Sequence, residues 1–306
     1  MRALFQHVAL IGIGLIGSSI ARAIREESLV REISIASRSG KTLDKARQLQ
    51  LGDNYSLDLP ETVKGADLVI ICTPLSTYQS IAKLIGNHLK KGTIITDVGS
   101  SKNCVHNHIV PFIPKGIHIV PGHPVAGTEK SGPENGFSEL FQGRWCILTP
   151  DANTDKNAIR QVSRFWEKIG MTVEVMSAER HDQILAVTSH LPHLIAYTIV
   201  STALNLEGHL REEIIKFSAS GFRDFTRIAA SDPIMWRDIF LENEKAVLTS
   251  LERFTNHLMI IKQAIEEKNG EKLFNIFKKT QGQKKKVIDA QQDMPEEQKI
   301  KPQILS

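Results

Sequence analysis

The chain has 306 residues, of which 41% are hydrophobic and 24% charged, and its formal net charge is +4. This length suits two domains of ordinary globular composition. Because no stripe interleaves basic with aromatic residues, we expect no nucleic-acid partner. No run approaches ~20 uninterrupted apolar residues, so we also expect no membrane span.

The cysteines and the N-terminal region bear on the cellular compartment. Cys72, Cys104 and Cys146 lie far apart and form no C-x-x-C pair, which favours reduced thiols. The apolar run from Val8 to Ile16 resembles the hydrophobic core of a secretory signal peptide. A buried strand that enters a glycine turn explains the run more fully, so the sequence predicts a cytoplasmic protein.

The first half of the chain alternates short β-rich runs with helix-like stretches. We expect helices over residues 15–25 and 42–51, and strands over residues 7–11, 32–36, 67–72, 93–97, 118–120 and 145–148. The run over residues 67–72 is apolar and β-branched, as in a strand buried on both faces. Repeated strand, helix and strand predict an α/β domain over residues 1–177, a doubly wound Rossmann-like parallel sheet.

From residue 178 to about 280, helix-compatible runs replace the strand patterns and predict an all-helical domain. Pro192 should kink or restart the helix expected over residues 182–206. Asp232 and Pro233 predict the start of another helix. The apolar content exceeds what this domain needs for its own core, so we expect a homodimer through it. Residues 281–306 are rich in Lys and Gln and predict a polar C-terminal tail.

A glycine motif lies between the first strand and the first helix. Gly12, Gly14 and Gly17 have the G-x-G-x-x-G spacing, with Leu15 and Ile16 between the last two. Such glycines allow a tight turn, close approach of the backbone to a pyrophosphate, and close contact between helix and sheet. The N–H groups at the start of the helix attract phosphate. The motif in this context predicts a site for NAD(P).

Two further segments bear on the same cofactor. Ser37, Arg38 and Ser39 follow the second strand, where a carboxylate would bind a ribose 2′-hydroxyl and repel a 2′-phosphate. A guanidinium between hydroxyls suits a phosphate, although Arg38 could equally be a solvated loop residue. NADP is therefore permitted and NAD is not excluded. After the next buried strand, we expect Cys72, Thr73 and Pro74 to line the ribose or nicotinamide.

His123 stands between Gly122 and Pro124. These neighbours predict a tight, stiff loop that aims the imidazole at a ligand. Five segments, taken together and in this order, resemble the prephenate/arogenate (cyclohexadienyl) dehydrogenase family. They are a Gly-Ser-x-Lys turn, a histidine loop, a Ser-His-Leu-Pro-His segment, an arginine segment and the stretch after it, at residues 97–102, 122–132, 189–193, 221–227 and 232–236.

The resemblance implies oxidative decarboxylation of prephenate, arogenate or both in tyrosine biosynthesis, with hydride transfer to NAD(P). It implies that His123 accepts the proton of the substrate hydroxyl. Ser100 should lie beside it, orienting the imidazole or meeting the same hydroxyl, although a turn or cap role is compatible. No residue decides between the two substrates. The family is often inhibited by tyrosine, and the sequence does not show whether this chain is.

For substrate binding, the resemblance implies that Arg227 clamps a carboxylate, while Arg223 could substitute for it or pair with Asp224. Four further residues have expected places in or near the substrate pocket: Ser189, His193, Glu129 and Trp236. Glu129 should gate the site or pair with an arginine, and Trp236 is core or pocket. His190 and His193 share a helical face, but spacing offers no third ligand, so we expect no metal.

Two other classes of function remain open. A two-domain NAD(P) oxidoreductase of the 3-hydroxyacid dehydrogenase or imine reductase type would share the glycine turn and a helical dimerising domain. A non-catalytic NADPH-sensing protein would keep the glycine turn alone. The first class does not predict the Gly-His-Pro segment, and the second has no reason to keep His123, Ser100 and Arg227 together.

Overall fold

The computed structural model describes residues 3–205, 213 and 216–289. The chain forms two compact units, Met1–Val247 and Leu248–Ser306. The first contains both sheets and most of the helices, and the second is built from two long helices.

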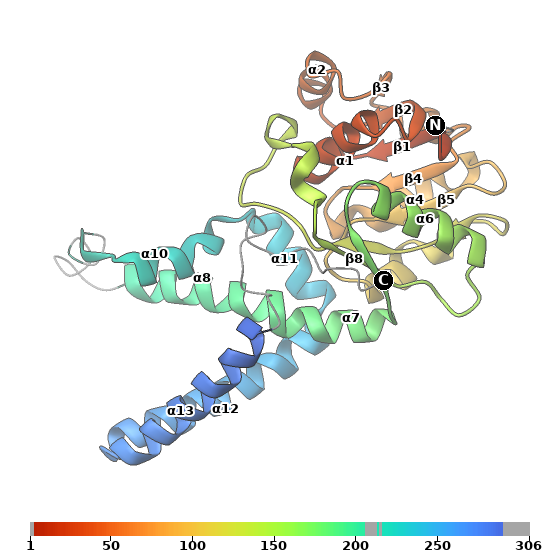
Figure 1. The fold of residues 1–306 in the computed structure, drawn as a ribbon. Coiled ribbons are helices and arrows are strands. Elements are labelled where there is room, and N and C mark those ends of the chain that lie inside the picture. Colours follow the sequence, from red (N-terminus) through yellow and green to blue (C-terminus); the bar gives the residue numbers. More distant parts are fainter. Residues whose placement is uncertain (1–2, 206–212, 214–215, 290–306) are drawn as a thin grey trace, which may run out of the picture. The chain divides into compact units, whose positions relative to one another are not determined.

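A six-stranded parallel sheet organises the first unit (Figure 1). Its strand order is β3-β2-β1-β4-β5-β6. The strands are β1 (Phe5–Ile11), β2 (Val30–Ala36), β3 (Asn54–Ser56), β4 (Leu68–Ile71), β5 (Ile94–Asp97) and β6 (His118–Ile119). The order reverses between β1 and β4, and ligands of doubly wound sheets bind at such a switch point. The predicted doubly wound sheet is confirmed.

Helices cover both faces of this sheet. Side chains of β1 alternate, so Val8 and Leu10 enter one core while Ala9 and Ile11 enter the other. The covering helices are α1 (Leu15–Glu26), α2 (Gly40–Gln48), α3 (Leu59–Val63), α4 (Tyr78–Ile85), α5 (Asn103–His108) and α6 (Lys156–Lys168). Helices α1 and α6 pack in the first core, and α4 and α5 in the second. This double burial explains the continuous apolar runs in the central strands.

A second, three-stranded sheet follows, with the order β7-β8-β9. Its strands are β7 (Gly122–Pro124), β8 (Trp145–Leu148) and β9 (Thr172–Val175). Strand β7 pairs antiparallel with β8, and β8 pairs parallel with β9. The strand expected over residues 145–148 is present, but it belongs to this sheet. The expectation that His123 lies on a loop is wrong, because His123 pairs with Ile147 in the β7–β8 ladder.

The helices that close the first unit begin at residue 178. They are α7 (Ala178–Leu185), α8 (Leu191–Leu204), α10 (Ser220–Thr226) and α11 (Pro233–Glu242). A π-helical turn, Ala186–His190, joins α7 to α8, and Pro192 lies in the first turn of α8. The helical stretch is continuous through Pro192, so the kink or restart predicted there is found as a π turn rather than as a break in the helix. The Asp232 carboxylate caps α11 by accepting from the Ile234 and Met235 N–H groups, as the sequence predicts.

The continuous helical stretch Ala178–Leu204 bears on the expectation of no membrane span. Within the described residues it is the one helix whose length and composition suit a span, with a mean hydropathy of 1.4 in its most apolar window. Helices of soluble proteins pass the same test. This stretch carries His181, Asp182 and His190, all buried in the first unit.

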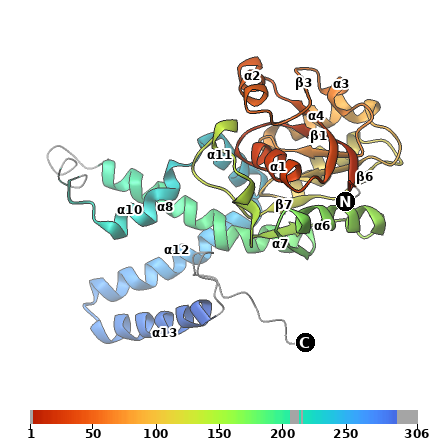
Figure 2. The ribbon, with the colours of Figure 1, turned by 45° about the horizontal axis from the view of Figure 1, so that its top comes forward.

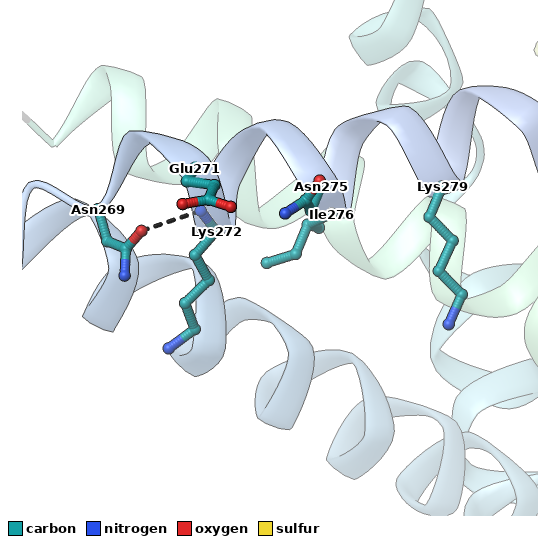
Figure 3. A pocket seen from close by; sticks show the side chains of 6 residues that line it. All are labelled: Asn269, Glu271, Lys272, Asn275, Ile276 and Lys279. Carbon is teal, nitrogen blue, oxygen red and sulfur yellow. Dashed lines mark hydrogen bonds between the residues drawn. The ribbon is translucent and has the colours of Figure 1, made fainter.

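The second unit contains a helical hairpin. Helix α12 (Glu244–Glu266) starts in the first unit and continues into the second, and α13 (Gly270–Asp289) runs back beside it (Figures 1 and 2). The predicted tail lies partly within α13, and residues 290–306 are outside the described residues. A pocket of about 540 Å³ lies beside α13, and none of the predicted site residues lines it. Figure 3 shows the side chains that line it: Asn269, Glu271, Lys272, Asn275, Ile276 and Lys279.

Candidate active site

The glycine turn joins β1 to α1 at the carboxyl edge of the parallel sheet. Gly12 has φ = +93°, a conformation that side-chain-bearing residues rarely adopt. A Cβ on Gly17 would lie 2.3 Å from the Gly12 carbonyl oxygen, whereas a Cβ on Gly14 would meet no atom within 4 Å. Gly14 precedes Leu15 and Ile16, the first residues of α1, and no side chain caps this helix. The turn therefore leaves backbone N–H groups facing open space, which fits a pyrophosphate.

The segment after β2 lies at the same edge, because Ile11 pairs with Ala36 in the sheet. The Ser39 hydroxyl caps α2 by accepting from the Thr42 N–H, and the Ser37 hydroxyl accepts from the Ser39 N–H. Arg38 is exposed. Both hydroxyls thus have local partners, and Arg38 is the side chain of this segment that faces solvent.

Cys72, Thr73 and Pro74 follow β4 directly behind the glycine turn. The Cys72 N–H donates to the Ile11 carbonyl at 2.7 Å. A Cβ on Gly12 would lie 2.8 Å from both the Cys72 carbonyl oxygen and the Thr73 side chain. Burial raises the pKa of the Cys72 thiol, so this thiol is not an activated nucleophile.

His123 is 7% exposed and lies in a chain of buried hydrogen bonds. Its Nδ1 is 2.8 Å from His181 Nε2, and His181 Nδ1 is 2.7 Å from Asp182 Oδ1. Burial lowers the pKa of His123 well below its usual value, and His181 and the Lys102 cation act in the same direction. The imidazole is therefore neutral at neutral pH and able to accept a proton.

A buried ion pair fixes the backbone beside His123. Lys102 Nζ donates to Asp97 Oδ2 at 2.5 Å and to the Gly122 carbonyl at 2.6 Å. Asp97 also accepts from the Tyr78 hydroxyl at 2.8 Å and from the Gly99 N–H at 2.9 Å. Because the ammonium bridges the Asp97 carboxylate and the Gly122 carbonyl, the pair holds β7 against the end of β5.

Ser100 lies in the turn between β5 and α5. It is half-buried, and it directly precedes Ser101, whose side chain is buried. Burial lowers the pKa of His190 to about 4. The next residue, Ser101, donates from its hydroxyl to Asp182 at 3.2 Å. The structure therefore brings the Ser100 turn to the same buried cluster as His181 and Asp182.

His193 and Trp236 form a stacked pair. Their ring centroids are 3.6 Å apart, with an angle of 21° between the planes. His193 Nδ1 lies 2.9 Å from the Ser189 carbonyl, which fixes the orientation of the imidazole. Trp236 is buried in the second core. Its ring and the His190 ring are arranged edge to face, with their centroids 6.0 Å apart. Trp236 is thus part of the core and also the platform on which His193 lies.

The two arginines of the arginine segment have different partners. Arg227 Nη1 is 3.0 Å from Glu129 Oε2, and the Arg227 side chain is 61% exposed. Arg223 pairs with Asp224 at 3.5 Å, and both of these side chains are exposed. Exposed ion pairs are weak, so the Arg227 guanidinium can exchange Glu129 for another carboxylate at low cost.

Known proteins resemble the chain along most of its length. Residues 20–175 match the prephenate dehydrogenase nucleotide-binding domain, and residues 177–279 match the prephenate dehydrogenase dimerization domain. The chain belongs to the prephenate dehydrogenase family. A cyclohexadienyl dehydrogenase of Zymomonas mobilis is 45% identical to it, over 90% of this chain and 94% of the relative.

Two further relatives agree with this family. A prephenate dehydrogenase of Bacillus subtilis is 35% identical, over 91% of this chain and 75% of its own length. The crystal structure of A. aeolicus prephenate dehydrogenase with hydroxyphenyl propionate and NAD+ has a TM-score of 0.85 and 36% identity, covering 92% and 98% of the two chains. The family predicted from the five segments is confirmed, and its dehydrogenase activity is favoured over the two alternative classes.

Part of the buried cluster was not predicted from the sequence. His181 and Asp182 lie between the recognised segments, and no spacing ties either of them to His123. Lys102 is the last residue of the Gly-Ser-x-Lys turn, and the sequence does not predict that its side chain is fully buried. In the described part of the chain, no three His, Cys, Asp or Glu side chains group as metal ligands would.

Proposed function

We propose that this chain catalyses the oxidative decarboxylation of prephenate, arogenate or both in tyrosine biosynthesis, with hydride transfer to NAD(P). The observation that carries the proposal is the buried, neutral His123 imidazole, hydrogen-bonded through Nδ1, in the same unit as an open glycine turn. A dehydrogenase that oxidises a hydroxyl needs both a base and a dinucleotide site. Family membership supports this reaction.

The residues at the sheet edge fit a dinucleotide. Gly12, Gly14 and Gly17, with the N–H groups of Leu15 and Ile16, would hold the pyrophosphate. Ser37, Arg38 and Ser39 would meet the adenosine ribose or its 2′-phosphate, and Cys72, Thr73 and Pro74 would line the ribose or nicotinamide. The bound nicotinamide supplies the hydride acceptor. A relative whose structure contains NAD+ supports this assignment.

His123 is the proposed base. Its Nε2 accepts the proton of the substrate's ring hydroxyl while hydride leaves the ring carbon that carries this hydroxyl. The hydroxyl oxygen thereby becomes a carbonyl oxygen. The electron pair of the carbon–carboxylate bond then enters the ring as CO2 departs. The ring becomes aromatic, and its oxygen takes the proton back from His123, so the base is regenerated.

The remaining assigned residues bind or orient the substrate. Arg227 would release Glu129 and clamp a substrate carboxylate with two parallel hydrogen bonds. His193, stacked on Trp236 and held by the Ser189 carbonyl, would present its free ring nitrogen to the substrate. Ser100 would orient the imidazole or contact the same hydroxyl. Tyrosine would inhibit by taking the same place, because it resembles the substrate.

We also propose a cytoplasmic homodimer, with domains over residues 1–177 and 178–280 and a polar tail over residues 281–306. The match of residues 177–279 to a dimerization domain supports the homodimer. Large apolar side chains are exposed along α12 and α13, where a partner would cover them: Leu248, Leu258, Met259, Ile260, Ile265, Phe274 and Phe277. A monomeric mass by light scattering at micromolar concentration would contradict the dimer.

The decisive experiment measures the absorbance of reduced nicotinamide with the purified chain. Prephenate and arogenate are each supplied with NAD and with NADP, and tyrosine is then added to any active pair. We expect reduced nicotinamide in at least one combination. Dinucleotide binding without turnover in all four would overturn the proposal and favour a sensor.

A further inference from the structure

Asp182 is a buried carboxylate surrounded by hydrogen-bond donors. Its Oδ1 accepts from the Lys102 N–H at 2.8 Å and faces His181 Nδ1 at 2.7 Å. Its Oδ2 accepts from the Asn103 N–H and amide and from the Ser101 hydroxyl, at 3.0, 2.8 and 3.2 Å. Five donors satisfy an ionised carboxylate in a site that is almost free of solvent. An ionised carboxylate only accepts, so His181 Nδ1 must carry a proton.

The position of the proton on His181 determines the position of the proton on His123. Burial lowers the pKa of His181 and outweighs the opposing effect of the hydrogen bond to Asp182, so the ring is neutral with its proton on Nδ1. His181 Nε2 is then a bare acceptor that lies 2.8 Å from His123 Nδ1. His123 must donate from Nδ1, and a neutral imidazole that is protonated at Nδ1 has an unprotonated Nε2.

We propose that His181 and Asp182 are positioning residues that hold His123 in the tautomer with Nδ1 protonated and Nε2 bare. This inference rests on the proposed function, because the bare Nε2 is the atom that accepts the hydroxyl proton. It adds two buried residues that act through His123. When His123 is protonated, its Nδ1–H keeps His181 Nε2 as its acceptor, and the Asp182 charge stabilises the cation through His181.

The helix that carries both residues is itself anchored. Asn243 Nδ2 donates to the Asp182 carbonyl at 2.8 Å and lies 3.1 Å from His190 Nδ1. Both positioning side chains are buried, and they come from α7, whereas His123 comes from β7. The tautomer is therefore set by the docking of α7 against the sheets, and a rotation of α7 would release it.

The tautomer can be observed directly in the resting protein. The full chain, labelled with nitrogen-15 at histidine, is measured by NMR at neutral pH, and His123 is assigned by comparison with His123→Asn. We expect a protonated Nδ1 and an unprotonated Nε2. The opposite tautomer, with His181 charged and donating to His123, would overturn the proposal.

Two conservative variants separate positioning from packing. His181→Gln places an amide oxygen near the former Nε2, so it can still accept from His123. His181→Asn can still contact Asp182 but does not reach His123. We expect kcat to fall roughly 10²-fold or more for Asn, because the tautomer is no longer fixed, and to stay within about tenfold for Gln.

The His123 tautomer seen by NMR should change in the variant that loses kcat and stay the same in the other. His123 should keep its wild-type tautomer in His181→Gln and lose it in His181→Asn, while dinucleotide affinity stays unchanged in both. Equal losses of kcat in the two variants, or no loss in either, would overturn the proposal. Failure of the proposed function is distinguishable, because it would appear as no reduced nicotinamide from the wild-type chain, whatever the tautomer.

Discussion

The glycine turn and the histidine cluster belong to one unit but act through different groups. The turn between Gly12 and Gly17 acts through backbone N–H groups, has no ionisable side chain, and opens into free space at Gly14. The cluster of His123, His181 and Asp182 acts through side chains that are almost completely buried.

This difference determines which changes each region tolerates. The turn requires room, so even a methyl group alters it, whereas its chemistry is only that of the peptide backbone. The cluster requires particular proton donors and acceptors, so a substitution of equal volume can still abolish its action. We therefore expect chemical changes to be most costly in the cluster and steric changes in the turn.

The largest expected effect is that of His123→Asn. The amide keeps much of the volume but cannot accept a proton as an imidazole does, so turnover should fall by roughly 10²–10⁴-fold. Dinucleotide affinity should be almost unchanged, since the turn is intact. Steady-state kinetics and a dinucleotide titration check both halves of this prediction. Turnover that survives the change would remove His123 from its assigned role.

The second prediction concerns stability against pH. The pKa values of His123, His181 and His190 are lowered in the folded state from about 6.5, that of His190 to about 4. Their stabilising contribution is full above pH 6.5 and declines below it, because the unfolded chain binds protons first. The free energy of unfolding should fall by up to about 1.4 kcal/mol per pH unit for each ring.

Urea denaturation at fixed protein concentration, from about pH 7 to about pH 5, measures this slope. His190→Gln should remove one ring's share of it and leave the rest. The glycine turn contains no ionisable group and should contribute nothing to the slope. A free energy of unfolding that does not depend on pH in this range would show that the three rings are not buried as neutral groups.

The glycine turn could be predicted from the sequence more fully than the histidine cluster. The glycine turn is contiguous, so its strand, its glycines and its helix could be recognised in one short segment. The end of β2 was also predicted, and pairing with an arginine was one of the two roles expected of Glu129, although that arginine was not identified as Arg227. Both depend on residues that recognisable segments carry.

The cluster could not be predicted in the same way. His181 is 58 residues from His123 and comes from another element, so no local spacing relates the two. Strand β7 has three residues, two of them Gly122 and Pro124, and offers no alternation that would identify a strand. Its partner β8 was expected, but which sheet it joins depends on long-range pairing. Long-range docking, rather than local propensity, decides these features.

The third prediction compares two glycines of the turn. In Gly17→Ala the new Cβ would lie 2.3 Å from the Gly12 carbonyl oxygen, so the variant should lose about 3 kcal/mol of stability. Gly14→Ala meets no atom within 4 Å and should keep its stability. Its dinucleotide affinity should still fall roughly tenfold, because the methyl group fills the space left for the pyrophosphate. Unfolding and titration of both variants test this, and equal stability of the two would contradict the packing argument.

The fourth prediction concerns the exposed ion pair of Arg227 and Glu129. Arg227→Ala should raise KM roughly tenfold with a smaller change in kcat, because it removes a charged hydrogen bond to the substrate. Glu129→Gln is the matched control: it frees Arg227 without removing it, so KM should stay the same or fall. A higher KM in both variants would mean that the pair itself, rather than Arg227 alone, shapes the site.

The smallest expected effect is that of Arg38→Ala at the edge of the cofactor site. Arg38 is exposed, so its pairing with a 2′-phosphate would be screened by water and worth about 1 kcal/mol. The Kd for NADP should rise roughly fivefold while the Kd for NAD stays constant, since NAD has no phosphate there. Titration of both dinucleotides at low and high salt measures this, because added salt should reduce the NADP difference. Equal weakening of NAD and NADP would assign Arg38 to the fold of the segment after β2 and leave the hydroxyls of Ser37 and Ser39 as the groups that face the ribose.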